Sequence, residues 1–212
     1  MGIRLVIAPT LEPITLGDVK LQCRIDDTAS DALITGTIIP AARAKAEQYM
    51  GAVLMQRTFD MLLDTFPTSS ASWMSEWTGD VQFERPPAWN SGCISPNPLT
   101  IVSIKYIDAA GVQQTLDPAT YSIDDSTWPF YALPAVGTDW PTARAQANAW
   151  AIRYTLGYDD TAKVPADVRS WLLLTAGFLW AHRESIDLTG KTIDIPNRFV
   201  DSLLDPYRVF SV

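Results

Sequence analysis

His182 is the only histidine in this 212-residue chain, and it opens a short polar group, His182-Arg183-Glu184. Histidine is the side chain most often used for proton transfer and metal binding near neutral pH. The H-x-E pattern of zinc deaminases needs a P-C-x-x-C sequence downstream, and no cysteine follows His182. A single histidine also cannot build a two-histidine zinc site, and the G-x-S-x-G motif of serine hydrolases is absent. We therefore expect no catalytic residue, and a hydrolase centred on His182 is the weakest reading.

Other groups that could do chemistry have simpler interpretations. Gly190-Lys191-Thr192 looks like the end of a phosphate-binding loop, but Ser185 stands where that pattern needs its first glycine. Cys23 and Cys93 match no metal spacing, and we expect two free thiols. The acidic doublets lack the alternating ligands and glycine of a calcium loop, so they read as caps and solvated turns. We predict no metal and no cofactor. The doublets are Asp26-Asp27, Asp124-Asp125 and Asp159-Asp160.

The overall charge argues against a tight nucleic-acid binder. The formal net charge is −8, and the 16 lysines and arginines form no basic run that could neutralise phosphates. The apolar share of 47% is enough for a real core. The N-terminal apolar run is too short for a signal peptide, and residues 170–181 are too few to cross a bilayer, which takes about 20 residues. We expect a soluble protein of cytoplasmic type without membrane contact.

Two outer regions read as helical. Thr15-Leu-Gly-Asp18 resembles a capping box and predicts a helix to about Arg24. A second helix is predicted to run to Met50 and to stop at Gly51, with a kink or split near Ile39 caused by Pro40. After Val164-Pro165 a long helix is expected to 185, and a short last helix from about 196 ends before Pro206.

The middle of the chain reads as strands and loops, with nine of the 15 prolines between positions 67 and 141. Residues 99–107 and 112–116 flank the turn Asp108-Ala-Ala-Gly111 and predict a hairpin. Further strands are predicted at 58–64, 81–85, 121–123 and 149–155, and segments 66–80 and 85–98 should be loops. We predict an α+β fold in a single domain, 1–212. A helical bundle would form from 14–51 and 164–206, with a β-rich subdomain at about 52–158 and a tail at 207–212.

The long helix carries apolar residues on two faces, which predicts burial on both. In a small domain the second face could meet the strands or another subunit. Eight tryptophans are also many for this length. Six of them lie in or beside the strand region, where core packing, a subunit interface or a sugar-binding platform are all open readings. They are Trp73, Trp77, Trp89, Trp128, Trp140 and Trp150.

Four segments together resemble the head–tail connector (adaptor) proteins of tailed bacteriophages. The resemblance runs over nearly the whole chain as a pattern of order, spacing and apolar character. It departs from the family at Pro40 and in the long Trp-rich middle region. The segments are ITLGDVKLQCRIDD, SDALITGTIIPAARAKAEQYMG, RYTLGYDDTAKVPADVRSWLLLTAGFLWAHRES and SLLDPYRV.

The resemblance implies a structural virion protein that forms a ring of about twelve copies under the portal. Such a ring extends the DNA channel, lets DNA pass without sequence-specific binding and joins the head to the next head-completion or tail protein. The alternative is a carbohydrate-binding or tail-associated module that uses the Trp-rich loops. Candidates for portal contact are Leu203, Leu204, Pro206, Tyr207, Arg208, Val209 and Phe210. Candidates for subunit packing are Ile38, Ala42, Tyr49, Trp171, Phe178 and Trp180.

Overall fold

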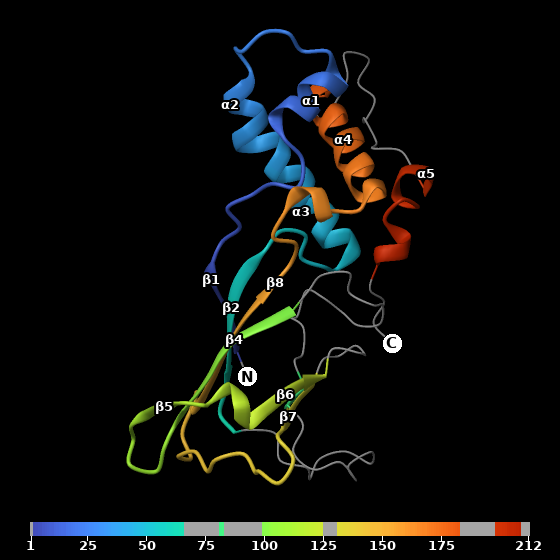
Figure 1. Ribbon diagram of the computed structural model, residues 1–212. Coiled ribbons are helices and arrows are strands. Elements are labelled where there is room, and N and C mark those ends of the chain that lie inside the picture. The colour runs from blue at the N-terminus through green and yellow to red at the C-terminus, as the bar shows by residue number, and fades with distance from the viewer. Residues whose placement is uncertain (1, 66–80, 83–98, 125–130, 183–197, 209–212) are drawn as a thin grey trace. The chain divides into compact units, whose positions relative to one another are not determined.

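The computed structural model describes residues 2–65, 81–82, 99–124, 131–182 and 198–208. These residues divide into two compact units, each built from segments that are distant in the sequence (Figure 1). The sheet unit takes the described parts of 1–8 and 57–157, and the helical unit takes those of 9–56 and 158–209. The predicted mixed α+β class is confirmed. That residues 1–212 form a single domain stays a prediction.

The sheet unit contains a five-stranded antiparallel sheet in the order β1-β2-β8-β4-β5 and a three-stranded sheet in the order β3-β7-β6. The strands of the first are β1 (Gly2–Ile7), β2 (Arg57–Leu63), β8 (Trp150–Leu156), β4 (Leu99–Ile107) and β5 (Gln113–Thr115). Those of the second are β3 (Val81–Gln82), β7 (Tyr131–Pro134) and β6 (Tyr121–Asp124). Segments 83–98 and 125–130 lie outside the described residues.

The central strand β8 shows why this sequence forms a sheet. Its buried residues alternate with half-buried ones, as expected for a strand with one face in a core. Met61 on β2 and Ile104 on β4 both pair with Ile152, and all three are fully buried. The core of this unit is therefore a row of large apolar side chains on one face of three adjacent strands.

The predicted hairpin is confirmed, because β4 and β5 pair across the turn at 108–112. One Asp108 carboxylate oxygen accepts hydrogen bonds from the amides of Ala110 and Val112, each at 2.9 Å. Gly111 has a φ of 83°, in the region that favours glycine. Two strands, β1 and β7, lie where the sequence predicted none.

In the helical unit, α1 (Leu16–Cys23) opens with the predicted capping box. The Asp18 amide donates to Thr15 Oγ1 at 3.1 Å, and the Thr15 amide donates to the Asp18 carboxylate at 2.9 Å. The two residues thus satisfy two amides at the helix start that have no partner within the helix.

The second predicted helix is present and has three sections. They are α2 (Asp31–Leu33), a π-helical turn (Ile34–Ile38) and α3 (Ile39–Met50). The change of winding occurs at Ile39, where the sequence predicted a break, because Pro40 has no amide hydrogen to donate. Gly51 ends α3 with a φ of 65°, and its amide donates to the Glu47 carbonyl.

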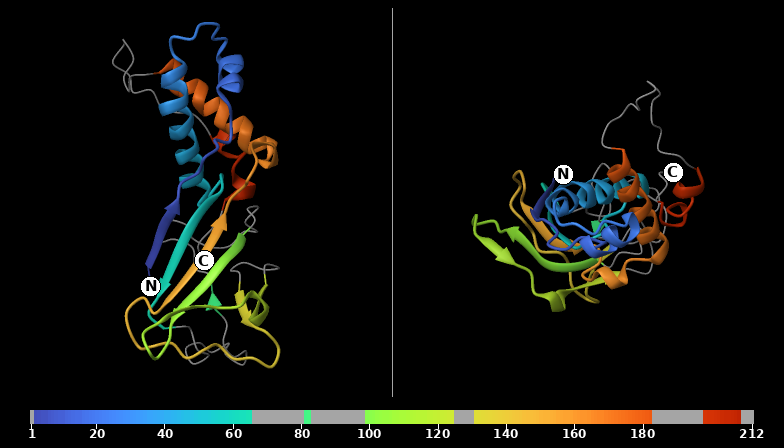
Figure 2. Two further views of the ribbon diagram at one scale, coloured as in Figure 1. Left: turned by 60° about the vertical axis from the view of Figure 1, so that its left-hand side comes forward. Right: turned by 90° about the horizontal axis from the view of Figure 1, so that it is seen from above.

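Helix α4 (Ala166–Ala181) is the longest helix of the described residues. It packs against α1 and α3, and the end-on view of Figure 2 shows these helices alongside one another. The chain closes with α5 (Arg198–Asp201) and a 3₁₀ turn (Asp205–Tyr207). Among the described residues, no helix is long and apolar enough to cross a membrane.

Candidate interaction surfaces

His182 lies at the C-terminal end of α4, and its surroundings are those of a helix end. Its backbone amide donates to the Phe178 carbonyl at 2.9 Å, and its exposed ring lies 4.6 Å from the Phe178 ring, centroid to centroid. Within the described part of the chain, no group of three or more His, Cys, Asp or Glu residues is placed to hold a metal ion. Residues 183–197, with the Gly190-Lys191-Thr192 sequence, lie outside the described residues.

One of the two apolar faces of α4 is buried within the helical unit. The residues on this face with the least exposure are Val168, Trp171, Leu172 and Thr175, and Ala176 is buried beside them. Leu174 is exposed, at 43% of its surface, and Leu173, Phe178, Leu179 and Trp180 are half-buried. The C-terminal half of α4 is therefore the part that retains accessible apolar surface.

The six residues predicted for subunit packing fall into two groups. Ile38, Ala42 and Trp171 are buried in the core of their own helical unit, because α3, the π-helical turn and α4 pack on one another there. These three side chains present almost no surface to a second copy. Tyr49, Phe178 and Trp180 are half-buried and keep accessible atoms.

The residues predicted for portal contact also differ in burial. Leu204 is fully buried in the core of the helical unit, whereas Leu203 and Tyr207 are half-buried against it. Pro206 and Arg208 are exposed. Val209 and Phe210 lie outside the described residues. The segment therefore has an inner side that anchors it and an outer side open to a partner.

Specific polar contacts attach this segment to α3 and α4. The Trp171 indole N–H donates to Asp201 Oδ1 at 3.1 Å, and the Tyr49 hydroxyl donates to Asp205 Oδ1 at 2.8 Å. The Arg208 guanidinium lies over the Tyr49 ring, 5.0 Å from its centroid. Burial raises the pKa of Tyr49, and the hydrogen bond to Asp205 raises it further. Sequence reasoning missed these contacts, since Tyr49 and Asp205 are 156 positions apart.

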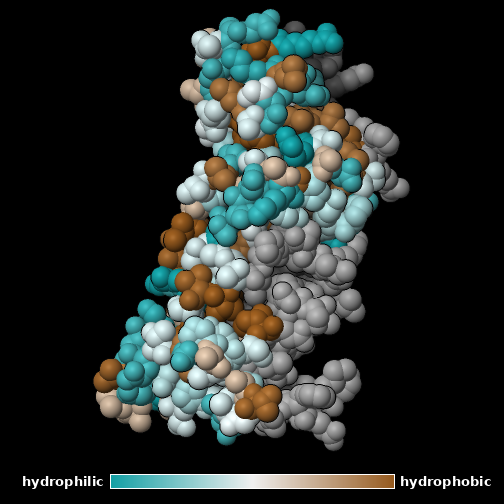
Figure 3. Space-filling model, viewed as in Figure 1, coloured by the Kyte–Doolittle hydropathy of each residue, from teal (hydrophilic) through white to brown (hydrophobic). Residues whose placement is uncertain are grey.

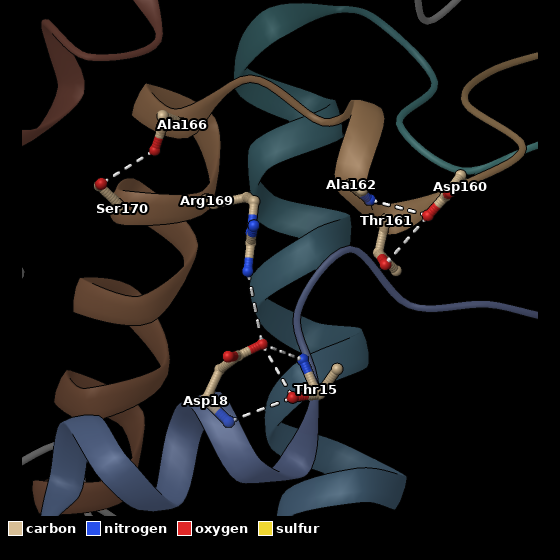
Figure 4. A network of polar contacts seen from close by, with 8 residues as sticks. All are labelled: Thr15, Asp18, Asp160, Thr161, Ala162, Ala166, Arg169 and Ser170. Atoms are coloured by element: carbon tan, nitrogen blue, oxygen red, sulfur yellow. Dashed lines mark hydrogen bonds and ion pairs between the residues drawn. The ribbon is translucent and has the colours of Figure 1, made fainter.

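A second polar network joins α1 to α4 (Figure 4). The Asp18 carboxylate that completes the capping box lies 3.7 Å from the Arg169 guanidinium. Hydrogen bonds from the Thr15 backbone and hydroxyl hold the pKa of Asp18 below its usual value, and the Arg169 charge adds to this. The capping carboxylate is thus ionised at neutral pH, where its charge is favourable at the start of α1.

Exposed hydrophobic side chains occur on both units. On the helical unit they are Leu11, Leu21, Leu33 and Leu174. On the sheet unit they include Leu5, Val6 and Ile7 of the edge strand β1, and Val102 at the bulge in β4. Figure 3 shows hydrophobic residues reaching the surface along the margin of the sheet that β1 occupies.

The structure describes only two of the six tryptophans for which core packing, a subunit interface and a sugar-binding platform were open interpretations. Trp150 is buried and stacks on Tyr106, with ring centroids 5.1 Å apart. Trp140 is half-buried and lies 6.5 Å from the Tyr121 ring. Trp73, Trp77, Trp89 and Trp128 lie outside the described residues. The two described members therefore act in packing within the sheet unit.

Comparison with known protein families gives a match in the N-terminal part of the chain. Residues 13–76 match the family described as phage gp6-like head-tail connector protein. This segment contains α1, the π-helical turn and α3, so the predicted resemblance to head–tail connector proteins is confirmed. No curated protein sequence matches the chain.

Solved structures extend the likeness of fold to the whole chain. One is from the neck of an empty gene transfer agent particle computed with C6 symmetry, with a TM-score of 0.66 and 17% identity. Another is from the virion of a native gene transfer agent particle, with a TM-score of 0.66 and 19% identity. A third, from the neck of a native particle computed with C12 symmetry, has a TM-score of 0.62 and 20% identity. In each case the match covers 100% of this chain and 97% of the other.

Proposed function

We propose that this protein is a non-enzymatic structural component of a phage or phage-like particle that connects head to tail. In this proposal several copies form a ring beneath the portal, extend the DNA channel and offer a surface to the next head-completion or tail protein. The observation that carries the proposal is the match of residues 13–76 to the gp6-like head-tail connector family. The fold likeness to gene transfer agent neck structures, one of them computed with C12 symmetry, supports it.

The distribution of surfaces is consistent with a ring subunit. A ring needs two different patches on each copy, because the same contact repeats from head to tail around the circle. The accessible apolar part of α4, with Leu174, Phe178 and Trp180, is our candidate for one patch. Ile38, Ala42 and Trp171 would act indirectly, by fixing the shape of the helices that carry it.

The charge of the chain suits a DNA conduit. A net charge of −8 gives long-range repulsion of phosphates, so DNA can pass without being held. Specific binding to DNA is not part of this proposal, and neither is a membrane contact.

The portal contact is assigned to the C-terminal segment. Pro206 and Arg208 form its exposed side, while Leu204 anchors its inner side. We expect that removal of Tyr207–Val212 leaves a folded protein, because the truncation leaves the buried Leu204 in place.

The experiment compares three proteins for binding to the cognate portal protein by native mass spectrometry. They are the full chain, a chain ending at Pro206, and the substitution Val136→Ser in an exposed loop of the sheet unit. The proposal predicts a complex of many copies for the full chain and for Val136→Ser, and none for the truncated chain. It would be lost if the full chain never bound portal but bound glycans on an array, as the alternative of a carbohydrate-binding module requires.

A further inference from the structure

The C-terminal segment has little regular structure of its own. Helix α5 has four residues, and the 3₁₀ turn has three. Between them the backbone makes only single-turn hydrogen bonds, such as the Leu204 amide to the Asp201 carbonyl at 2.9 Å. Helical segments this short do not persist in water, because the nucleation cost exceeds what a few hydrogen bonds return. The conformation of residues 198–208 therefore depends on what holds them to the rest of the unit.

Leu203 and Tyr207 of this segment pack against the core of the helical unit. Four further contacts are more specific, and we call them together the clasp. They are Trp171 with Asp201, Leu204 in the core, Tyr49 with Asp205, and Arg208 over the Tyr49 ring. These contacts extend along the whole described segment, from Asp201 in α5 to Arg208. Each partner on the other side belongs to a core helix, because Tyr49 lies in the last turn of α3 and Trp171 near the middle of α4.

The two ends of the clasp differ in exposure. Trp171 is only 1% exposed, so its indole N–H is fixed by packing and satisfied by Asp201. Tyr49 is half-buried, whereas its two partners, Asp205 at the hydroxyl and Arg208 over the ring, are exposed. The buried contact of Trp171 with Asp201, the inner end of the clasp, thus supplies stability. The contacts of Tyr49, the outer end, set the direction of the chain where Pro206 and Arg208 reach the surface.

We propose that the clasp is a positioning device that presents the C-terminal segment to its binding partner in one preformed conformation. The inference rests on the proposed function, because the partner is taken to be the portal. A preformed segment loses less conformational freedom on binding than a mobile one, so it binds more tightly without additional contacts. Tyr49 and Asp205 are positioning residues in this account, since their effect passes through the segment they hold.

The test uses two substitutions at the outer end of the clasp and one matched control. Tyr49→Phe removes the hydroxyl and keeps the ring, and Asp205→Ala removes the acceptor. Asp159→Ala is the control. Like Asp205, Asp159 is an exposed aspartate whose carboxylate accepts a hydrogen bond from another side chain, that of Lys163 at 2.7 Å. Amide hydrogen exchange of residues 198–208 and affinity for the portal are measured for each full-length protein.

The proposal predicts faster exchange in 198–208 and roughly tenfold weaker portal binding for Tyr49→Phe and Asp205→Ala, with unchanged melting temperature. The double variant should bind no more weakly than either single variant, because both remove the same interaction. Asp159→Ala should match the wild type in every measurement.

The outcomes separate this inference from the function on which it rests. If the chain ending at Pro206 binds portal normally, the assigned contact and the clasp proposal both fail. If that truncation abolishes binding while Tyr49→Phe and Asp205→Ala bind like the wild type, the connector function stands and the clasp proposal fails. Unchanged exchange in both variants also overturns it.

Discussion

Among the described residues of the sheet unit, Asp60 is the most deeply buried charged group, with a side chain only 6% exposed. It lies between Arg4 and Arg153 in a row across β1, β2 and β8, where the three residues are register partners. Arg153 donates two hydrogen bonds to its carboxylate, at 2.7 and 2.9 Å, and Arg4 donates one at 2.9 Å. The hydrogen bonds from Arg153, and then those from Arg4, lower the pKa of Asp60 against the opposing effect of burial.

Asp60→Asn should lower the free energy of unfolding by about 1–3 kcal/mol, because two guanidinium groups lose a charged acceptor. Since the folded-state pKa of Asp60 is lowered, its contribution is present above the ordinary value of about 3.9 and is lost as pH falls through the folded value. Urea unfolding at neutral and acid pH measures both effects. Asp159→Asn, at an exposed ion pair, should leave the free energy of unfolding nearly unchanged, because solvent screens that pair. Equal costs for the two variants would contradict the account.

The buried Tyr158 should make the stability of the helical unit sensitive to alkaline pH. Burial, with a smaller contribution from Tyr207, raises the pKa of Tyr158 to about 12. A tyrosine with a raised folded pKa stabilises the fold below the unfolded value of about 10, and this stability is lost as pH rises through about 12. The free energy of unfolding should fall over that window, and Tyr158→Phe should make the fall less steep. Denaturant unfolding followed by tyrosinate absorbance measures it, and identical slopes for both proteins would refute this.

Residue-scale chemistry was predictable only where the partners are near in sequence. The capping box of Thr15 and Asp18 follows a four-residue pattern, and the structure contains it. The Tyr49–Asp205 hydrogen bond joins residues that no local pattern relates. His182 drew attention because of its type, yet in the structure it ends a helix beside Phe178.

At the scale of elements, the helix of residues 31–50 shows how a proline is accommodated without ending a helix. The π-helical turn Ile34–Ile38 precedes Pro40, and α3 then continues to Met50. A π-turn shifts the backbone hydrogen-bond register by one residue. The helix can therefore continue past Pro40, although proline has no amide hydrogen to donate. Ile34 and Ile38 remain buried through this change, so the apolar face stays continuous with that of α3.

Two glycines of this helix should respond differently to replacement by alanine. Gly51 has a φ of 65°, which strains any residue with a Cβ, so Gly51→Ala should destabilise by about 1 kcal/mol. Gly36 lies within the helix with open space around its Cα, so Gly36→Ala should be neutral or stabilising by up to about 1 kcal/mol. Thermal unfolding of the two variants measures the difference. A stabilising Gly51→Ala would contradict the assigned role of the helix stop.

The elements that sequence reasoning missed have physical reasons for being missed. In β1, apolar residues lie on both faces, and Leu5, Val6 and Ile7 are all exposed at the sheet edge, so the strand lacks the usual alternation. In β7, the four residues end in Pro134, which weakens a strand signal. The long strands β2, β4 and β8 were predictable because they are rich in apolar residues and bounded by turns.

At the scale of the whole molecule, sequence pattern could not distinguish internal from intersubunit burial. The two apolar faces of the long helix suggested more surface than one small domain could cover. The structure buries Trp171, Ile38 and Ala42 within the chain and leaves Leu174, with the half-buried Phe178 and Trp180, at the surface. Only the packing of helices from both ends of the chain decides which apolar residues remain for a partner.

The connector proposal is tested most directly by electron cryo-microscopy of the head–tail junction in particles assembled with this protein. It predicts a ring of copies with this fold, coaxial with the portal and open along the DNA path, whose subunits contact the portal through the predicted C-terminal residues, Leu203 to Phe210. Particles assembled with the chain ending at Pro206 should lack the ring. A junction whose density accommodates no copy of this fold would contradict the account.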